Sequence, residues 1–321
     1  MAVTASSLHR PPASEYAALL AGAGLFDRSE HGKLAVTGPD AADFLDSLLS
    51  NDIQALGEGS GCDATLLTHK GRMLAVLRVL HIAGEHWLDT ERICLQALFD
   101  ALHQYRVGYA AELHKRTLEQ GLLSLIGPRA QEVLGTDVPV AEHASVAAMV
   151  AGTAVTLVRT DVGVDVICAA DSTAAIAQEL ERSGAQRVGE DAVECLRVER
   201  GRPRFGPDID EQTMPQEAGL HTRAVSYSKG CYVGQETVAR LYWKGRPNRH
   251  LRGLILSAPA EPGASLRLDT EPVGALGSVA ISPALGAIAL ALVRRKAAIG
   301  DVLTLDDSDA TAVVCDLPFS S

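Results

Sequence analysis

Aromatic residues and long apolar runs are both scarce in this sequence. Phe, Trp and Tyr together make up 4 % of its 321 residues. The longest apolar stretch is about ten residues near 284–293, whereas a membrane-spanning helix needs about 20. The N-terminal residues also lack the apolar core of a secretory signal peptide. We therefore expect a cytoplasmic protein that does not enter a membrane.

Positive charge is also in short supply. The chain has 29 Lys and Arg residues against 40 Asp and Glu residues, which gives a net charge of −11. Proteins that bind nucleic acid without sequence preference need a basic surface, so nucleic acid is not an expected partner. Apolar residues make up 47 % of the chain and charged residues 21 %, which excludes a disordered protein. At ~150 residues per domain, the length predicts about two domains.

Closely spaced cysteines are absent. The chain has six, and no two lie closer than 27 positions, so no C-x-x-C pair is available for zinc. The ten histidines show no H-x-H or H-E-x-x-H spacing, and we expect no metal site, although distant cysteines could still meet in space. Apolar neighbours predict buried thiols at four positions: Cys94, Cys168, Cys195 and Cys315.

Strands and helices alternate along the first 200 residues, which is typical of an α+β fold. One predicted helix begins at Ala41, with Asp40 as its N-cap and an apolar stripe that includes Phe44. Another covers residues 191–200 and ends at Gly201, since glycine often terminates helices. No G-x-G-x-x-G sequence follows a predicted strand, so a dinucleotide-binding fold has no support.

The composition and the hydrophobic pattern of the sequence change near residue 250. From Leu251 on, short apolar runs are separated by Gly, Pro and Asp at a spacing of about 8–12 residues, which predicts a small antiparallel β-barrel. The preceding stretch, residues 201–250, is polar, rich in Pro and Gly, and holds five of the 13 aromatic residues. A loop this long is more often functional than not. We place the domain boundary between residues 1–248 and 249–321.

Cys231 differs from the other cysteines in its neighbours. Lys229 is two residues away, Gly230 leaves the thiol uncrowded, and a short helix is predicted over 233–241. A nearby cation and a helix N-terminus both favour a thiolate, so the sequence indicates a reactive thiol. The alternative is an ordinary loop cysteine that packs against Tyr232.

Basic and aromatic residues are interleaved just after this segment. Such a strip suits a flat, anionic, heteroaromatic ligand, because rings stack and guanidinium groups pair with carboxylates. The alternative is a solvated linker. One carboxylate upstream is expected to bind ring N–H donors, among candidates that include Glu194, Glu199 and Glu217. The strip consists of Tyr242, Trp243, Lys244, Arg246, Arg249, His250 and Arg252.

A set of motifs in this region resembles the signature of YgfZ-type folate-binding proteins, which belong to the superfamily of the glycine-cleavage T-protein, GcvT. The K-G-C-Y-x-G-Q-E core matches over eight consecutive residues, and weaker similarity covers nearly the whole chain. The matching positions are Glu199-Arg200-Gly201, Gly206, Asp208, Pro215-Gln216-Glu217, Lys229 to Glu236, Arg240, Gly38-Pro39-Asp40, Ser50-Asn51-Asp52, Gly71-Arg72 and Ser282-Pro283.

The resemblance implies a three-domain ring, with two interleaved α/β domains and a C-terminal antiparallel β-barrel around a central channel that binds tetrahydrofolate or another reduced folate. Glu199 falls at the position of the T-protein's pterin-binding glutamate. The other residues expected to bind the folate are Tyr232, Arg240, Arg246 and Arg249. In the YgfZ type, the motif cysteine, here Cys231, supports assembly or repair of iron–sulfur enzymes, and we expect Lys229 to act with it. Iron–sulfur client enzymes or cluster-assembly proteins are therefore expected partners.

One departure from the T-protein pattern bears on activity. T-proteins carry a G-G-x-x-D-D sequence, and here the two acids are replaced by Ala75 and Val76. Apolar side chains cannot deprotonate an amine, so aminomethyl transfer by that mechanism is not expected. The alternatives to an iron–sulfur accessory protein are a folate-dependent one-carbon transferase or demethylase, and a related binding module without folate.

Overall fold

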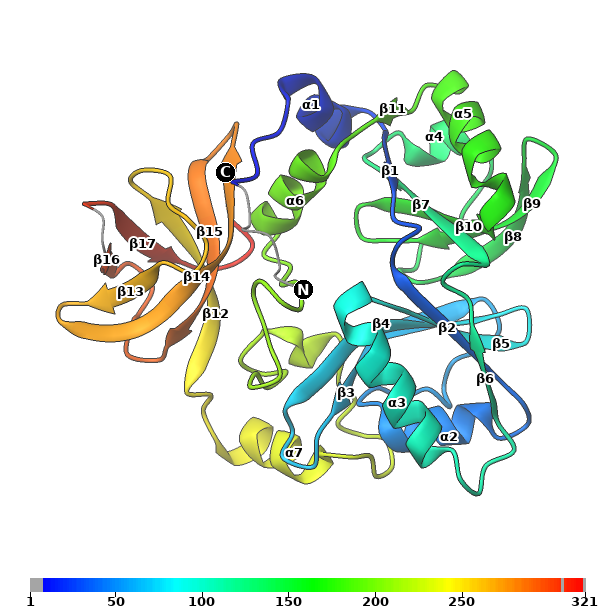
Figure 1. Ribbon diagram of the computed structural model, residues 1–321, viewed down its shortest axis with the longest axis horizontal. Coiled ribbons are helices and arrows are strands. Elements are labelled where there is room, and N and C mark those ends of the chain that lie inside the picture. The colour runs from blue at the N-terminus through cyan, green and yellow to red at the C-terminus, as the bar shows by residue number, and fades with distance from the viewer. Residues whose placement is uncertain (1–7, 307–308, 320–321) are drawn as a thin grey trace.

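The computed structural model describes residues 8–306 and 309–319. Two sheets and a closed barrel are arranged in a ring (Figure 1), with the barrel on one side and both sheets on the other. The expected α+β architecture, including the C-terminal antiparallel barrel, is confirmed. No helix in the described part of the chain is long and apolar enough to span a membrane.

The first sheet has five strands in the order β3-β4-β5-β2-β6. One of its faces packs against α2 (Ala41–Leu48) and α3 (Leu95–Tyr105), whose apolar stripes bury Phe44 and Leu98 completely. The strands are β2 (Gly32–Thr37), β3 (Ser60–Leu67), β4 (Met73–Ile82), β5 (Glu85–Thr90) and β6 (Glu112–Lys115).

The second sheet has six strands in the order β11-β1-β7-β10-β9-β8, so it takes strands from both sides of the first sheet in sequence. This is the interleaving that the sequence comparison implied. Helices α4 (Ala130–Leu134) and α5 (Thr173–Arg182) pack on it. The strands are β1 (Gly24–Asp27), β7 (Gln120–Ile126), β8 (Ser145–Val150), β9 (Thr153–Arg159), β10 (Gly163–Ala169) and β11 (Gln186–Arg187).

The barrel closes in the order β12-β15-β14-β13-β16-β17, with an apolar interior. Because β12 is its first strand, the barrel begins at Arg249, and the division of the chain at 248/249 stays a prediction. The strands are β12 (Arg249–Leu256), β13 (Ser265–Leu268), β14 (Glu271–Ser282), β15 (Gly286–Arg294), β16 (Val302–Leu305) and β17 (Thr311–Cys315).

Three helices connect these parts. Helix α6 (Glu190–Glu199) packs against β14, β15 and α1 (Ala13–Ala21), and so joins the barrel to the second sheet (Figure 1). It ends as predicted, with Gly201 at a φ of +65°. Helix α7 (Gln235–Lys244) lies between the barrel and the first sheet. It begins and ends later than the predicted 233–241.

Two local predictions need correction. Asp40 stands at the N-cap of α2 as predicted, but its side chain caps no helix N–H, because its carboxylate accepts a hydrogen bond from Ala110 N at 2.7 Å and so links the helix start to the chain before β6. Cys315 is half-buried rather than buried, since it lies on the last strand of the barrel near its surface. The buried positions predicted for Cys94, Cys168 and Cys195 are confirmed.

Candidate functional site

A cavity of about 630 Å³ lies where the two sheets meet α6. Its lining comes from β1 and the turn after it, strands β3, β4, β5, β7 and β10, the loops before β8 and β10, helix α6 and the loops after it. None of the described barrel residues lines it. Charged side chains dominate the wall, because ten acidic residues line it together with eight arginines: Arg28, Arg78, Arg92, Arg197, Arg200, Arg202, Arg204 and Arg223.

The interface between the two sheets changes character along its length. Away from the cavity, β4 and β5 pack against β7, β9 and β10 through apolar side chains that include Leu80, Trp87 and Leu122. At the cavity, Arg78 instead joins the sheets, with its guanidinium 2.7 Å from Asp89 on β5 and 2.8 Å from Asp165 on β10. Burial alone would raise the pKa of Asp89, but Arg78 and then His31 hold it well below its usual range.

The α6 wall is built around a second buried arginine. Arg197 pairs with Glu194 at 2.8 Å and with Asp208 at 2.8 Å, while Arg204 approaches Glu194 at 3.1 Å. Burial would raise the pKa of Glu194, but the two arginines lower it, so this carboxyl stays ionised. Asp208 also accepts a hydrogen bond from Ser278 N at 2.8 Å, which fixes the wall to the barrel strand β14.

A third group of charges lies on the opposite wall. Arg223 binds Asp63 at 2.8 Å and Glu142 at 2.6 Å, and His143 Nε2 lies 3.4 Å from Asp63. Burial opposes ionisation of Asp63, but the contacts to His143 and Arg223 lower its pKa. These contacts tie β3 to the loop before β8, so they close the cavity between the first and second sheets.

The positions that lack carboxylates relative to T-proteins face in opposite directions. Val76 lines the cavity, whereas Ala75 is fully buried in the core under α2 and α3. This follows from the alternation of side chains along β4. Only position 76 could therefore present a side chain to a ligand here, and valine supplies no proton acceptor.

None of the seven site residues expected from the sequence lines this cavity. The carboxylate of Glu199 accepts a hydrogen bond from Tyr16 on α1 at 2.8 Å and lies 3.6 Å from the Cys195 thiol. Burial and then this bond raise the pKa of Tyr16. Glu199 therefore contacts α1 in this structure, and its role in binding folate stays a prediction.

Lys229 holds the motif segment to α2. Its side chain is 1 % exposed, and its ammonium donates to the carbonyl oxygens of Asp46, Leu49 and Asn51 and contacts the Asp46 carboxylate at 2.8 Å. A cation is favourable at the carboxyl end of a helix, where carbonyl groups lack partners. The ammonium also lies 5.3 Å from the centre of the buried Tyr232 ring. Both residues thus have structural contacts, and their predicted functional roles stay untested.

Cys231 is the one exposed cysteine of the six, all of which the structure describes. Burial raises the pKa of Cys62 to about 12 and of Cys94 to about 11, so those thiols are poor nucleophiles at neutral pH. The helix α7 begins four residues after Cys231, at Gln235, and is preceded by Gly234 at a φ of +84°. A side chain at Gly234 would lie 2.5 Å from Thr68 O, so the motif glycine is needed where the chain crosses the β3–β4 turn.

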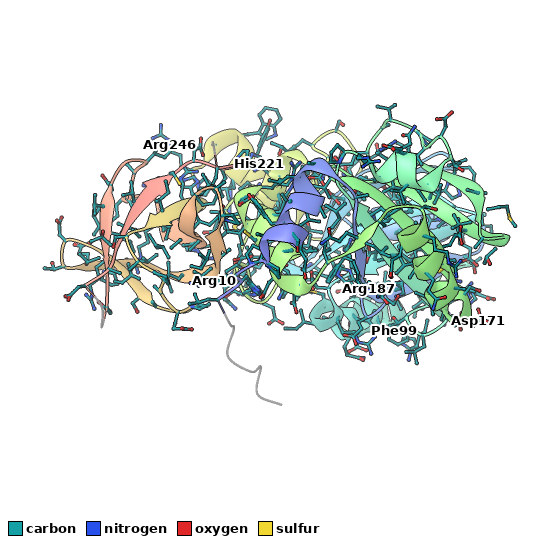
Figure 2. All side chains as sticks on the ribbon, turned by 90° about the horizontal axis from the view of Figure 1, so that it is seen from above. Arg10, Phe99, Asp171, Arg187, His221 and Arg246 are labelled. Carbon is teal, nitrogen blue, oxygen red and sulfur yellow. The ribbon has the colours of Figure 1, made fainter. Side chains whose placement is uncertain are left out.

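The three predicted arginines lie outside the cavity wall. Arg249 is paired with Glu217 at 2.9 Å and lines a smaller cavity of about 400 Å³ beside the barrel. Arg240 is exposed on α7, and Arg246 is exposed just after it. Figure 2 shows Arg246 and His221 along the same edge of the molecule. Nearby, Tyr242 stacks on Tyr227 with ring centres 3.9 Å apart.

Of the charged residues of the wall, the sequence analysis named Glu194 as a candidate carboxylate and Arg200 as a matching position, and it missed the others, although some left a signal. Arg78 lies in the otherwise apolar run M-L-A-V-L-R-V-L, and Asp165 in G-V-D-V-I-C. An isolated charge inside an apolar strand needs a buried partner, and these two are partners of each other. His31 and Asp89 carried no comparable signal. Among residues 8–306 and 309–319, no group of His, Cys, Asp and Glu is placed to hold a metal ion.

Comparisons with known proteins agree with this architecture. The model of the GCVT N-terminal domain family matches residues 4–229. A putative chloroplastic transferase of Arabidopsis thaliana is 28 % identical over 91 % of this chain and 70 % of its own length. An aminomethyltransferase of Rubrobacter xylanophilus is 28 % identical over 95 % of this chain and 85 % of its own. The glycine cleavage system aminomethyltransferase T of Bartonella henselae superposes with a TM-score of 0.86, at 26 % identity over 96 % of this chain and 89 % of its own.

Proposed function

Because the chain belongs to the GCVT N-terminal domain family, we propose that it binds a reduced folate, such as tetrahydrofolate, in the 630 Å³ cavity. The observation that carries the proposal is the position of this cavity in a fold that matches an aminomethyltransferase over nearly its whole length. A reduced folate has a flat ring with hydrogen-bonding edges and an anionic tail. The cavity offers apolar surface at Phe26, Val76 and Phe205, and an exposed Arg92 at its rim for a carboxylate.

Calorimetry with 5-formyltetrahydrofolate, a stable reduced folate, tests this proposal. The wild-type protein is expected to bind it, and Val76→Trp is expected to abolish binding by filling the cavity. Val107→Trp is the matched control, since Val107 is 88 % exposed, away from the cavity lining. Absence of binding to the wild type, or equal binding to both variants, refutes the proposed site.

The proposed role of the bound folate is that of one-carbon acceptor or donor in a group transfer. The names of the relatives support a transferase. Val76 counts against the aminomethyl transfer of glycine cleavage, because no carboxylate is present at that position to accept a proton. We therefore expect no turnover when this protein replaces the T component in a reconstituted glycine-cleavage assay. Turnover there would identify it as an aminomethyltransferase.

A second candidate role rests on Cys231. An exposed thiol inside the K-G-C-Y-x-G-Q-E motif supports a cytoplasmic accessory protein for iron–sulfur enzymes, in which the thiol acts beside the folate-binding domain. A strain lacking the protein is expected to lose activity of iron–sulfur enzymes and to regain it with the wild-type gene but not with Cys231→Ser. Cys62→Ser is the control, because that thiol is half-buried and burial raises its pKa to about 12. Full rescue by Cys231→Ser would remove the thiol from the mechanism.

A further inference from the structure

His31 lies in the turn between β1 and β2 and lines the cavity. The turn is fixed by a backbone hydrogen bond from His31 N to Arg28 O at 2.9 Å. Nδ1 of the ring lies 2.8 Å from Asp89 Oδ1, and the other oxygen of Asp89 accepts from Arg78 at 2.7 Å. The imidazole is therefore held in one orientation by a buried carboxylate that is itself held by a buried guanidinium.

The contacts define which ring nitrogen carries the proton. Arg78 keeps Asp89 ionised, and an ionised carboxylate can only accept a hydrogen bond, so Nδ1 must donate. In the neutral ring, Nε2 then bears the lone pair. The carboxylate nearest to Nε2 is Glu91, at 3.8 Å, which is beyond hydrogen-bonding distance.

Charged side chains surround the His31–Asp89 pair on each adjoining element. Arg28 on the same turn has Nη2 3.3 Å and 3.4 Å from Nδ1 and Nε2, and because a guanidinium only donates, its long hydrogen bond goes to the lone pair of Nε2. Lys33 on β2 stands opposite Asp89 in the strand register, but its ammonium is buried and donates to Ser29 O at 2.6 Å. Asp165 on β10 forms an ion pair with the other side of the Arg78 guanidinium. The carboxylates at Asp89, Glu91 and Asp165 thus accompany the cations of Arg28, Lys33 and Arg78.

Two histidines line the cavity, and only one has this arrangement. The Nδ1 atom of His143 is buried without a hydrogen-bond partner, and its Nε2 lies 3.4 Å from Asp63. A buried, unpartnered nitrogen opposes a second proton on that ring. His31 lines the cavity with a short bond on Nδ1 and only a long one, 3.4 Å from Arg28, on Nε2, an arrangement from which a general base can act.

We propose that His31, oriented by Asp89, is the acid–base group of the central cavity and acts on an amine nitrogen of the bound ligand. As that nitrogen forms a bond to the carbon of a one-carbon unit carried by an amine donor, it loses its N–H proton to Nε2. The imidazolium then gives this proton to the donor nitrogen, whose bond to the same carbon breaks, so the site regains its starting state. This proposal rests on the proposed ligand cavity.

The tautomer can be measured in the free wild-type protein by ¹⁵N nuclear magnetic resonance of the histidine rings. The expected result is His31 protonated on Nδ1, with Nε2 bare at neutral pH. Asp89→Asn is expected to abolish this preference, because an amide can donate as well as accept. His103, exposed on α3, is the internal control and should show the usual mixture of tautomers. A His31 ring protonated on Nε2 in the wild type overturns the proposal.

Ligand contact is tested by chemical modification with diethyl pyrocarbonate, read for each histidine by mass spectrometry. At 5-formyltetrahydrofolate about ten times its Kd, only about a tenth of the protein is free, so modification of His31 should slow about tenfold while that of His103 is unchanged. Calorimetric binding without protection of His31 refutes this inference alone. No calorimetric binding refutes the proposed function itself.

Discussion

The signature segment, residues 229–240, and the wall of the cavity differ in what their polar groups do. In the signature segment, contacts hold parts of the fold together: Lys229 secures the end of α2, and Val238 O of α7 accepts a hydrogen bond from Gln216 at 2.8 Å. In the wall, Arg78 and Arg197 hold carboxylates that also line an open volume. The segment that is easiest to recognise in the sequence thus has contacts that are mostly structural, while its Cys231 thiol is exposed.

This contrast shows why a motif and a site need not coincide. A sequence motif can mark a place where the fold needs one particular residue type. Lys229 meets such a need, because its buried ammonium donates to three carbonyl groups. A cavity wall is assembled from single residues on many strands, each unremarkable in its own segment. Four substitutions or conditions can test whether the two regions are as different as their contacts indicate.

The largest effect is expected at the wall. Arg78→Met leaves the buried carboxylates of Asp89 and Asp165 without their shared cation, so the free energy of unfolding should fall by about 4–5 kcal/mol. Urea denaturation measures this directly. The control is Arg72→Met, which alters an exposed arginine near the start of the same strand and should change stability by less than about 0.5 kcal/mol. Equal effects of the two substitutions would contradict the buried network.

A smaller loss is expected in the signature segment. Lys229→Met removes the ammonium from the end of α2 and leaves the Asp46 carboxylate unpaired, for an expected loss of about 3 kcal/mol. Lys70→Met, at an exposed turn, serves as the control in the same denaturation experiment. If both variants melt like the wild type, Lys229 is not structural, and its predicted effect on Cys231 gains support.

Lowering the pH should progressively reduce the free energy of unfolding, because the carboxylates of the cavity wall lose their ion pairs. Asp63, Asp89 and Glu194 have pKa values lowered in the folded state, so the unfolded chain binds more protons than the folded one at low pH. Their stabilisation is complete above the unfolded values of about 4 and is lost as pH falls through the folded values, at about 1.4 kcal/mol per pH unit and carboxylate. Urea denaturation between pH 7 and acid pH checks this trend. A flat profile down to pH ~3 is incompatible with these ion pairs.

The smallest effect on stability is expected at Cys231. Because its side chain is exposed, Cys231→Ser should change the free energy of unfolding by less than about 0.5 kcal/mol and leave folate affinity intact. Thermal unfolding and calorimetry provide the two measurements. Cys195→Ser is the contrasting variant, because the Cys195 thiol is fully buried beside Glu199. The more polar hydroxyl of serine should lower the free energy of unfolding of this variant. Loss of stability in Cys231→Ser would place this cysteine with the structural residues of the segment.

The sequence by itself determined the class of fold and most of its elements. Apolar periodicity placed α2 and the helix that ends at Gly201, and the short runs after Leu251 indicated the barrel. These features are local, since they depend on side chains only a few residues apart. The same dependence on nearby residues explains the error at Asp40. It has the residue type of an N-cap, but its carboxylate accepts a hydrogen bond from the backbone of Ala110, 70 positions away.

The tertiary structure alone decided where the cavity lies and which residues form it. His31, Arg78, Asp89 and Asp165 come from four elements on two sheets, and no spacing in the sequence brings them together. It also decided that Val76 faces the cavity while Ala75 faces the core, and that the ammonium of Lys229 points to α2. The physical reason is that pairing of buried charges depends on distances across the interface between sheets, which the order of residues in the chain does not encode locally.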